Sequence, residues 1–264
     1  MSILKKICNH KLNEIKLLKN NFTEKYLLDE INQQQKPRGF CAALKKSVKH
    51  NQFALIAELK KSSPSKGVIR KDFSAKNIAQ AYQSGGASCL SVLTENKWFQ
   101  GQIRDFKEAK KSSNLPILRK DFILDPWQVM ESRSIGADCI LIILAAVDDR
   151  TADDLIKVSK DFNMDILVEV HNENELERAI KLDPDLIGIN NRNLNTLSVD
   201  IETTIKLSRK VPEKYDIVCE SGIETNADLK KISNYGVSRF LVGESLMKNH
   251  DITNATKRLL GTYK

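Results

Sequence analysis

The sequence is poor in aromatic residues, cysteines and histidines. Aromatic side chains make up 6% of the 264 residues, too few for the base-stacking surfaces of single-strand nucleic-acid binders. The five cysteines form no CxxC pair, and the four histidines lack the spacing of metal ligands. These patterns argue against a disulfide framework and against a metal site, and they favour a reducing, cytoplasmic location.

Long apolar stretches are missing as well. The longest, Cys139–Val147, is far too short to cross a bilayer, and the first residues lack the apolar segment of a signal peptide. We therefore expect a soluble protein that does not bind a membrane. Hydrophobic residues, at 41%, are still numerous enough to build a sizeable core.

Positive charge exceeds negative charge. Lys and Arg number 42 against 34 Asp and Glu, a formal net charge of +8. The lysines are spread in pairs such as Lys5-Lys6 and Lys110-Lys111, without a long block of like charge. This pattern is typical of solvated helix faces, so no nucleic-acid partner is expected. A positive field would still attract a small anionic substrate.

Eight short apolar runs alternate with segments of helical periodicity. The runs are Phe53–Leu59, Ser88–Leu93, Leu115–Leu118, Cys139–Leu144, Ile166–Val170, Leu186–Asn190, Ile217–Cys219 and Phe240–Val242. The helical segments are Ala75–Gln83, Ile103–Lys110, Ala152–Lys160, Glu173–Ile180, Ile201–Lys210 and Asn226–Ser233. Such alternation indicates βαβ units in a parallel sheet. Eight units favour a closed α/β barrel, the (β/α)8 or TIM barrel, and no GxGxxG turn supports an open dinucleotide-binding sheet.

The first fifty residues stand outside this repeat. Ile3–Leu18 and Tyr26–Ile31 have the periodicity of amphipathic helices. We predict a single domain over residues 1–264, with an N-terminal helical extension over residues 1–50 and the barrel over residues 51–264. The extension should pack over one end of the barrel, and periodicity alone does not say which end.

Polar side chains interrupt or end most of the apolar runs. Because active sites of such barrels lie at the carboxyl ends of the strands, these side chains should converge on one mouth. Glu58 and Lys60 are two residues apart and share one side of a strand. A structural ion pair would explain them, but convergence of further charges favours an acid–base site. The further residues are Lys120, Glu169, Asn190, Arg192 and Glu220.

Two glycine turns follow the last two runs, at Ser221-Gly222 and Gly243-Glu244. In these barrels the corresponding loops commonly bind phosphate through backbone N–H groups. Together with the Lys and Glu residues they predict a phosphosugar ligand and acid–base chemistry without a metal. His171 follows the fifth run, where it could face the mouth, but we expect a solvated loop residue.

Seven segments then form a specific pattern. They are Ile56–Gly67, Leu90–Thr94 with Phe99-Gln100-Gly101, Leu118–Ile123, Val168–His171, Gly188–Leu194, Glu220–Ile223 and Leu241–Glu244. Together they resemble the indole-3-glycerol phosphate synthase family over nearly the whole chain. The resemblance implies a carboxy-lyase of tryptophan biosynthesis that needs no cofactor. Its substrate would be 1-(2-carboxyphenylamino)-1-deoxyribulose 5-phosphate, which closes into indole-3-glycerol phosphate with loss of carbon dioxide and water.

The resemblance also implies roles for single residues. Lys120 would be the acid of ring closure, and dehydration would use Glu169 or Lys60 as acid and Glu58 as base. Asn190 would assist catalysis by orienting the sugar hydroxyls, together with Arg192. Other substrate contacts would come from Ser63, Phe99, Phe122, Leu141 and Glu220, although apolar packing alone would explain the three apolar residues. Phosphate would bind at Ser221, Gly222, Gly243 and Glu244, and residues 63–67 would form a mobile lid.

Two alternatives accompany this interpretation. One is a related phosphosugar barrel such as phosphoribosylanthranilate isomerase, whose Cys/Asp pair is replaced here by Glu58 and Glu169. The other is a barrel that binds a phospho-ligand or RNA without catalysis. We expect a monomer with a small-molecule phosphosugar substrate, and docking of a pathway enzyme stays open.

Overall fold

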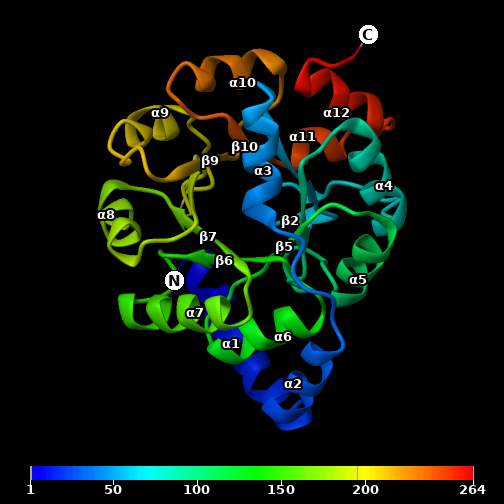
Figure 1. Ribbon diagram of the computed structural model, residues 1–264, viewed down its shortest axis with the longest axis vertical. Coiled ribbons are helices and arrows are strands. Elements are labelled where there is room, and N and C mark those ends of the chain that lie inside the picture. Colours follow the sequence, from blue (N-terminus) through cyan, green and yellow to red (C-terminus); the bar gives the residue numbers. More distant parts are fainter. Residues whose placement is uncertain (1, 195, 264) are drawn as a thin grey trace.

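Eight parallel strands close into a barrel in the computed structural model, which describes residues 2–194 and 196–263 (Figure 1). The strands are β1 (Ala54–Leu59), β4 (Cys89–Leu93), β5 (Ile117–Lys120), β6 (Cys139–Ile143), β7 (Asp165–Val170), β8 (Leu186–Asn190), β9 (Asp216–Glu220) and β10 (Arg239–Val242). Each strand overlaps one predicted run. The ring is closed by β1 and β10, where Ala54 lies opposite Arg239. The predicted (β/α)8 barrel is therefore confirmed.

Helices follow the strands and surround the barrel (Figure 1). They are α4 (Ala75–Gly85), α5 (Ile103–Ser112), α6 (Pro126–Ser134), α7 (Asp149–Asp161), α8 (Glu173–Leu182), α9 (Glu202–Ser208), α10 (Asn226–Ser233), α11 (Glu244–Met247) and α12 (Ile252–Leu260). The six predicted segments each overlap one helix. The sequence analysis missed α6 because polar side chains such as Gln128 and Arg133 are buried along it, which removes the apolar stripe of an amphipathic helix.

Alternating strand residues build two apolar layers. Leu55, Ala57 and Leu59 of β1 point outward into the core between the strands and the helices. Ala54 and Ile56 point inward and pack with α3 (Phe40–Lys49), a helix that the sequence analysis also missed. Phe40 and Leu44 are fully buried there, so α3 closes the amino end of the barrel.

The N-terminal extension covers both ends of the barrel. In Figure 1, α3 lies across its centre, while α2 (Glu24–Asn32) packs beside α6. At the other end, Nζ of Lys11 in α1 (Ile3–Asn21) lies 3.2 Å from a carboxylate oxygen of Asp121, directly after β5. The open question of the sequence analysis is thus answered: α1 lies at the carboxyl ends of the strands and α3 at the amino ends.

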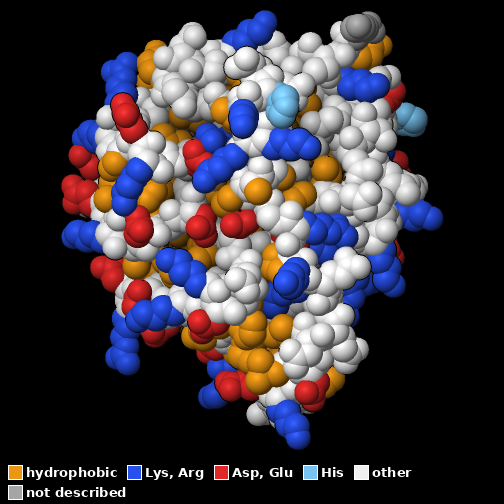
Figure 2. All heavy atoms as spheres, viewed as in Figure 1, with side chains coloured by type: hydrophobic (Ala, Val, Ile, Leu, Met, Phe, Trp, Pro, Cys, Tyr) orange, Lys and Arg blue, Asp and Glu red, His pale blue; other side chains and the backbone are white. Residues whose placement is uncertain are grey.

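Two more features bear on function. The segment predicted as a lid forms a short antiparallel hairpin of β2 (Ser62–Ser63) and β3 (Gly67–Val68), and its mobility stays a prediction. On the face shown in Figure 2, basic and acidic side chains are interspersed. Among the described residues, no helix is long and apolar enough to cross a membrane.

Candidate active site

A cavity of about 790 Å³ opens at the carboxyl ends of the strands. Of the residues predicted for the site, it is lined by Glu58, Lys60, Phe99, Lys120, Phe122, Leu141, Glu169, Asn190, Arg192, Glu220, Ser221, Gly222, Gly243 and Glu244. Ser63 instead lines an adjoining cavity of about 100 Å³, which reaches Ile3 and Ile7 of α1. The structure thus brings the predicted residues to one mouth, with the N-terminal helix at its edge.

Lys120 lies among carboxylates at the end of β5. Its Nζ is 3.0 Å from Oε2 of Glu169 and 3.6 Å from Oε2 of Glu220. Burial disfavours the cation, but Glu169, Glu220 and Glu58 outweigh burial and raise the pKa of Lys120. Lys120 is therefore an ammonium group aimed into the cavity, able to stabilise negative charge on a bound molecule.

Two glutamates beside Lys120 differ in protonation. Burial alone would raise both pKa values, but Lys120 and hydrogen bonds lower the pKa of Glu169 below its usual range. Burial and the neighbouring Glu169 raise the pKa of Glu220 to about 8. Oε1 of Glu220 has no hydrogen-bond partner among the described residues. The surroundings thus favour the ionised form of Glu169 and the protonated form of Glu220.

The predicted pair on β1 is an ion pair. Nζ of Lys60 lies 2.8 Å from Oε1 of Glu58, and the hydroxyl of Ser91 donates to Oε2 at 3.4 Å. Burial opposes ionisation, but Lys60 and Lys120 lower the pKa of Glu58. Glu58 is thus a carboxylate at neutral pH. It can accept a proton inside the cavity.

Two glycines leave room for these carboxylates. A Cβ atom on Gly188 would lie 2.2 Å from Oε1 of Glu220, and one on Gly243 would lie 2.7 Å from Oε1 of Glu58. At either position an added side chain would force the neighbouring carboxylate to move, so glycine allows the carboxylate to keep its place. Gly243 therefore contacts Glu58 directly, in addition to its predicted place at the phosphate.

Asn190 connects Glu169 with the loops after β8 and β9. Its amide donates to Oε1 of Glu169 at 3.1 Å. Its carbonyl oxygen accepts the Ser221 hydroxyl at 2.9 Å and the backbone N–H of Arg192 at 3.0 Å. This network fixes the Glu169 carboxylate and orients the Ser221 side chain toward the predicted phosphate end.

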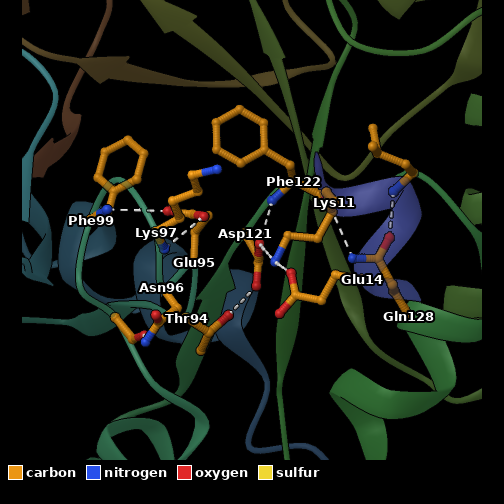
Figure 3. Close-up of polar contacts among 12 residues, drawn as sticks. Lys11, Glu14, Thr94, Glu95, Asn96, Lys97, Phe99, Asp121, Phe122 and Gln128 are labelled. Atoms are coloured by element: carbon orange, nitrogen blue, oxygen red, sulfur yellow. Dashed lines mark hydrogen bonds and ion pairs between the residues drawn. The ribbon is translucent and has the colours of Figure 1, made fainter. Parts of the chain in front are cut away.

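Two phenyl rings lie along one side of the mouth. The ring centroids of Phe99 and Phe122 are 6.3 Å apart, and the planes are tilted by 41°. Figure 3 shows that a buried carboxylate accepts the backbone N–H of each of these two phenylalanines. The N–H of Phe99 donates to Glu95 at 3.1 Å, and that of Phe122 donates to Asp121 at 2.8 Å. The two rings form an apolar wall suited to a planar aromatic group.

Another part of the cavity wall is rich in turns and carries cations. Ser221 and Gly222 both have positive φ, 65° and 82°, and Gly243 precedes the short helix α11. Lys66 of the hairpin loop and Arg192 line the same cavity. The cations and the backbone turns together make this side suitable for an anion such as a phosphate.

The expectation for His171 was wrong. Its side chain is only 10% exposed, with Nε2 3.1 Å from Oε1 of Glu169 and Nδ1 3.0 Å from Oε2 of Glu175. The sequence analysis placed His171 in solvent because a histidine after a strand is commonly a loop residue. Glu175 four residues later was the available signal, since the two can meet across the start of α8.

Residues 4–259 match the protein-family model described as indole-3-glycerol phosphate synthase. Among curated proteins, an indole-3-glycerol phosphate synthase of Zymomonas mobilis subsp. pomaceae is 45% identical over 260 residues, covering 98% of both chains. One of Azospirillum brasilense is 45% identical over 258 residues, again with 98% of both chains covered. These similarities extend over the strands, the extension and the whole cavity.

Solved structures share the architecture at low sequence identity. A 3-hexulose-6-phosphate synthase from Salmonella typhimurium superimposes with a TM-score of 0.64 at 14% identity, covering 80% of this chain and 98% of that one. An N-acetylmannosamine-6-phosphate 2-epimerase from Clostridium perfringens gives a TM-score of 0.58 at 20% identity, covering 73% and 86%. At such identities these similarities support the barrel fold alone.

Proposed function

The chain belongs to the indole-3-glycerol phosphate synthase family, and on that basis we propose how the residues at its barrel mouth carry out the reaction. The enzyme is a carboxy-lyase of tryptophan biosynthesis. It closes the ring of 1-(2-carboxyphenylamino)-1-deoxyribulose 5-phosphate to form indole-3-glycerol phosphate. The observation that carries the proposed roles is Lys120, a buried cation facing Glu169, Glu220 and Glu58.

Ring closure is the first task. The aromatic carbon that bears the carboxylate attacks the ribulose carbonyl, and negative charge develops on the carbonyl oxygen. Lys120 stabilises this charge and donates a proton to the oxygen. Protonated Glu220 supports the step because it adds no negative charge beside the incoming substrate carboxylate. The carboxylate then leaves as carbon dioxide, and its bonding electrons return to the ring.

Dehydration is the second task. The new hydroxyl leaves as water and takes a proton from an acid, while the ring loses one proton to a base as the indole forms. Glu58 is the base, because it is ionised and lies 2.8 Å from the Lys60 ammonium. Lys60 or Glu169 is the acid, and Glu169, which is ionised in the free enzyme, must first take up a proton to serve in this role. The groups are close enough to share protons, so their titrations are coupled.

The remaining residues orient the substrate. Asn190 and Arg192 bind sugar hydroxyls and the carboxylate, and Glu220 and Ser63 complete the polar contacts. Phe99, Phe122 and Leu141 enclose the anthranilate ring. The phosphate binds at Ser221, Gly222, Gly243 and the backbone N–H of Glu244. Support comes from the shared cavity, which is lined both by the phenyl rings and by the turns after β9 and β10.

The setting of the enzyme is also a proposal. We infer one domain over residues 1–264, because α3 shares its core with the inner faces of the strands; residues 1, 195 and 264 lie outside the described part. We further propose a cytoplasmic monomer whose partner is its phosphosugar substrate. Five free cysteines suit a reducing compartment. Gel filtration at micromolar concentration tests the oligomeric state.

A direct assay tests the function. The purified protein is incubated with the carboxyphenylamino-deoxyribulose phosphate, and indole fluorescence is followed. We expect a saturable increase. A folded sample that binds the substrate without forming indole would favour a binding barrel without catalysis. Conversion of phosphoribosylanthranilate in a parallel assay would favour the isomerase alternative.

A further inference from the structure

The proton balance of the proposed reaction leaves one proton unaccounted for. Lys120 gives a proton to the carbonyl oxygen, and the dehydration acid gives one to the leaving hydroxyl. Only the base that deprotonates the ring gains a proton, because the carboxylate departs as carbon dioxide without one. Each turnover therefore consumes one proton, and the site must obtain it from solvent before Lys120 can act again.

A continuous chain of titratable groups leads from Lys120 toward the surface. Nζ of Lys120 is 3.0 Å from Oε2 of Glu169, and Oε1 of Glu169 is 3.1 Å from Nε2 of His171. Nδ1 of His171 is 3.0 Å from Oε2 of Glu175, on the first turn of α8. The two oxygens of Glu169 thus face a different nitrogen each, so the carboxyl group can take a proton from one nitrogen and, after rotation, give it to the other.

The outer end of this chain reaches solvent. The side chains of His171 and Glu175 are 10% and 13% exposed, whereas that of Glu169 is 2% exposed. Lys120 is 14% exposed, but it lines the cavity that the substrate fills. Glu175 is held in place because it also accepts the backbone N–H of His171 at 2.8 Å and the Asn172 amide at 2.6 Å. Nε2 of His171 is itself buried and has no aligned hydrogen-bond partner among the described residues. A small rotation toward Glu169 would give it one.

Other groups beside Lys120 do not offer the same connection. The Glu220 carboxyl is 2% exposed, and its Oε1 is buried without a hydrogen-bond partner among residues 2–194 and 196–263, so Oε1 does not connect Glu220 to the surface. Lys60 faces the cavity itself, where bound substrate separates it from solvent. His171 is not among the described residues that line the cavity, so a substrate bound there would leave it uncovered.

We propose that His171 is the proton entry of this enzyme: it passes a solvent proton through Glu169 to Lys120 once per turnover. This inference rests on the proposed function. The imidazolium gives its Nε2 proton to Oε1 of Glu169. The neutral carboxyl group then turns about its Cγ–Cδ bond, so that the protonated oxygen faces Lys120 and gives this same proton to the amine. The neutral ring then takes its replacement from water or a buffer acid when the side chain swings toward its exposed edge. Glu175 anchors the ring and stabilises its charge.

The pKa values of His171 and Lys120 favour proton transfer toward Lys120. Burial opposes the charge on His171, but Glu169 and Glu175 raise its pKa to about 10, so the ring is protonated between turnovers. The pKa of Lys120 is raised above its ordinary value of 10.5. A neutral Lys120 therefore withdraws a proton from His171, and the transfer runs inward.

His171→Gln tests the proposal, with His50→Gln on the exposed end of α3 as the matched control. We expect kcat of H171Q in dilute buffer to fall about tenfold or more, within the range of proton-transfer contributions, while KM stays within about twofold. With enzyme in excess, a single turnover should proceed within about threefold of the wild-type rate, because Lys120 starts protonated. Added imidazole should restore steady-state turnover of H171Q in a saturable manner and leave H50Q unchanged.

Two outcomes would overturn the proposal. If the single-turnover rate falls as far as kcat, or if imidazole has no effect, His171 only positions Glu169 and the proton enters elsewhere. Should H171Q fail to fold, Glu175→Gln replaces it, since the amide oxygen can still accept the backbone N–H of His171 and only the contact with the Asn172 amide is lost. We then expect a smaller loss of kcat and the same rescue by imidazole. If imidazole does not rescue this variant, the proposal is overturned. Wild-type enzyme in the same assay must form indole; its failure would refute the function instead.

Discussion

Lys11 and Asp121 form a buried ion pair that ties the N-terminal helix to the active-site mouth. Nζ lies 3.2 Å from Oδ1, and the two side chains are 5% and 1% exposed. Figure 3 shows Lys11 reaching down from α1 between Asp121 and Glu14. Asp121 directly follows Lys120 and also accepts the Thr94 hydroxyl at 2.5 Å. The position of α1 is thereby coupled to the loop that carries Lys120 and Phe122.

Lys11→Met should therefore destabilise the enzyme. Removal of one partner leaves a buried carboxylate, but Arg119 at 3.4 Å still faces Asp121. We expect a loss of about 1–3 kcal/mol, below the full cost of an unpaired buried charge. Urea unfolding measures the loss, and Lys16→Met on the exposed face of the same helix should stay within about 0.5 kcal/mol. Equal stability of the two variants would show that the ion pair is energetically neutral.

Two substitutions of Lys120 separate its charge from its proton. Lys120→Arg keeps a cation opposite Glu169 and should bind the substrate within about tenfold, but arginine does not release a proton at neutral pH. Its kcat should fall by on the order of 10²–10⁴. Lys120→Met should also abolish turnover, with weaker folding because the buried carboxylates of Glu169 and Glu58 lose their common cation. Substantial turnover by Lys120→Arg would mean that Lys120 acts through charge alone.

Gly243→Ala should impair catalysis more than phosphate binding. The added Cβ would lie 2.7 Å from Oε1 and 3.0 Å from Cβ of Glu58, so the carboxylate must move away from Lys60. We expect kcat to fall about tenfold or more and stability to decrease by about 1–3 kcal/mol from overpacking. Steady-state kinetics distinguish the causes. A higher KM with unchanged kcat would assign Gly243 to the phosphate alone.

His171 should make stability depend on pH above neutrality. Its pKa is about 10 in the folded enzyme, because Glu169 and Glu175 outweigh burial, and about 6.5 in an unfolded chain. A raised folded pKa gives stability that is complete below about pH 6.5 and is lost as the pH rises toward 10. Between these values the stability of wild type relative to H171Q should fall by up to about 1.4 kcal/mol per pH unit.

Urea titrations of both proteins from pH 6 to pH 10 measure this difference. The fold of the variant is checked at pH 6 by its circular dichroism. A difference that stays constant across the range would show that His171 is neutral in the folded enzyme.

The sequence was sufficient to predict the repeated strands and helices and the polar residues at the strand ends. Apolar runs and helical periodicity located the eight barrel strands, and polar residues at the strand ends, such as Glu58 and Asn190, located the cavity. Buried polar networks were beyond such patterns. From its position beside Lys120, Arg119 could be taken for a site residue. Its side chain instead forms an ion pair with Glu131, with 2.7 Å between Nη1 and Oε2. That contact also explains why α6 lacks an apolar stripe, because its buried face is partly charged.

The sequence analysis also could not predict electrostatic effects between residues that lie far apart in the chain. The protonation of Glu220 depends on Glu169 and Lys120, which come from other strands. The helix α3 was missed for a related reason. Its buried residues Phe40 and Leu44 pack inside a barrel that is formed by later segments, so α3 does not show the pattern of a surface helix. Such relations require the closed structure, since no local pattern contains both partners.

The closure of the barrel by β1 and β10 also has a consequence for biosynthesis. Ala54 leaves the ribosome long before its partner Arg239, and α3 emerges before any strand that will cover Phe40 and Leu44. Pairing between such distant segments is slow, and apolar surface stays exposed meanwhile. A nascent chain that ends before β10 therefore exposes apolar residues of α3 that the closed barrel would bury. We expect chaperones to bind such a chain.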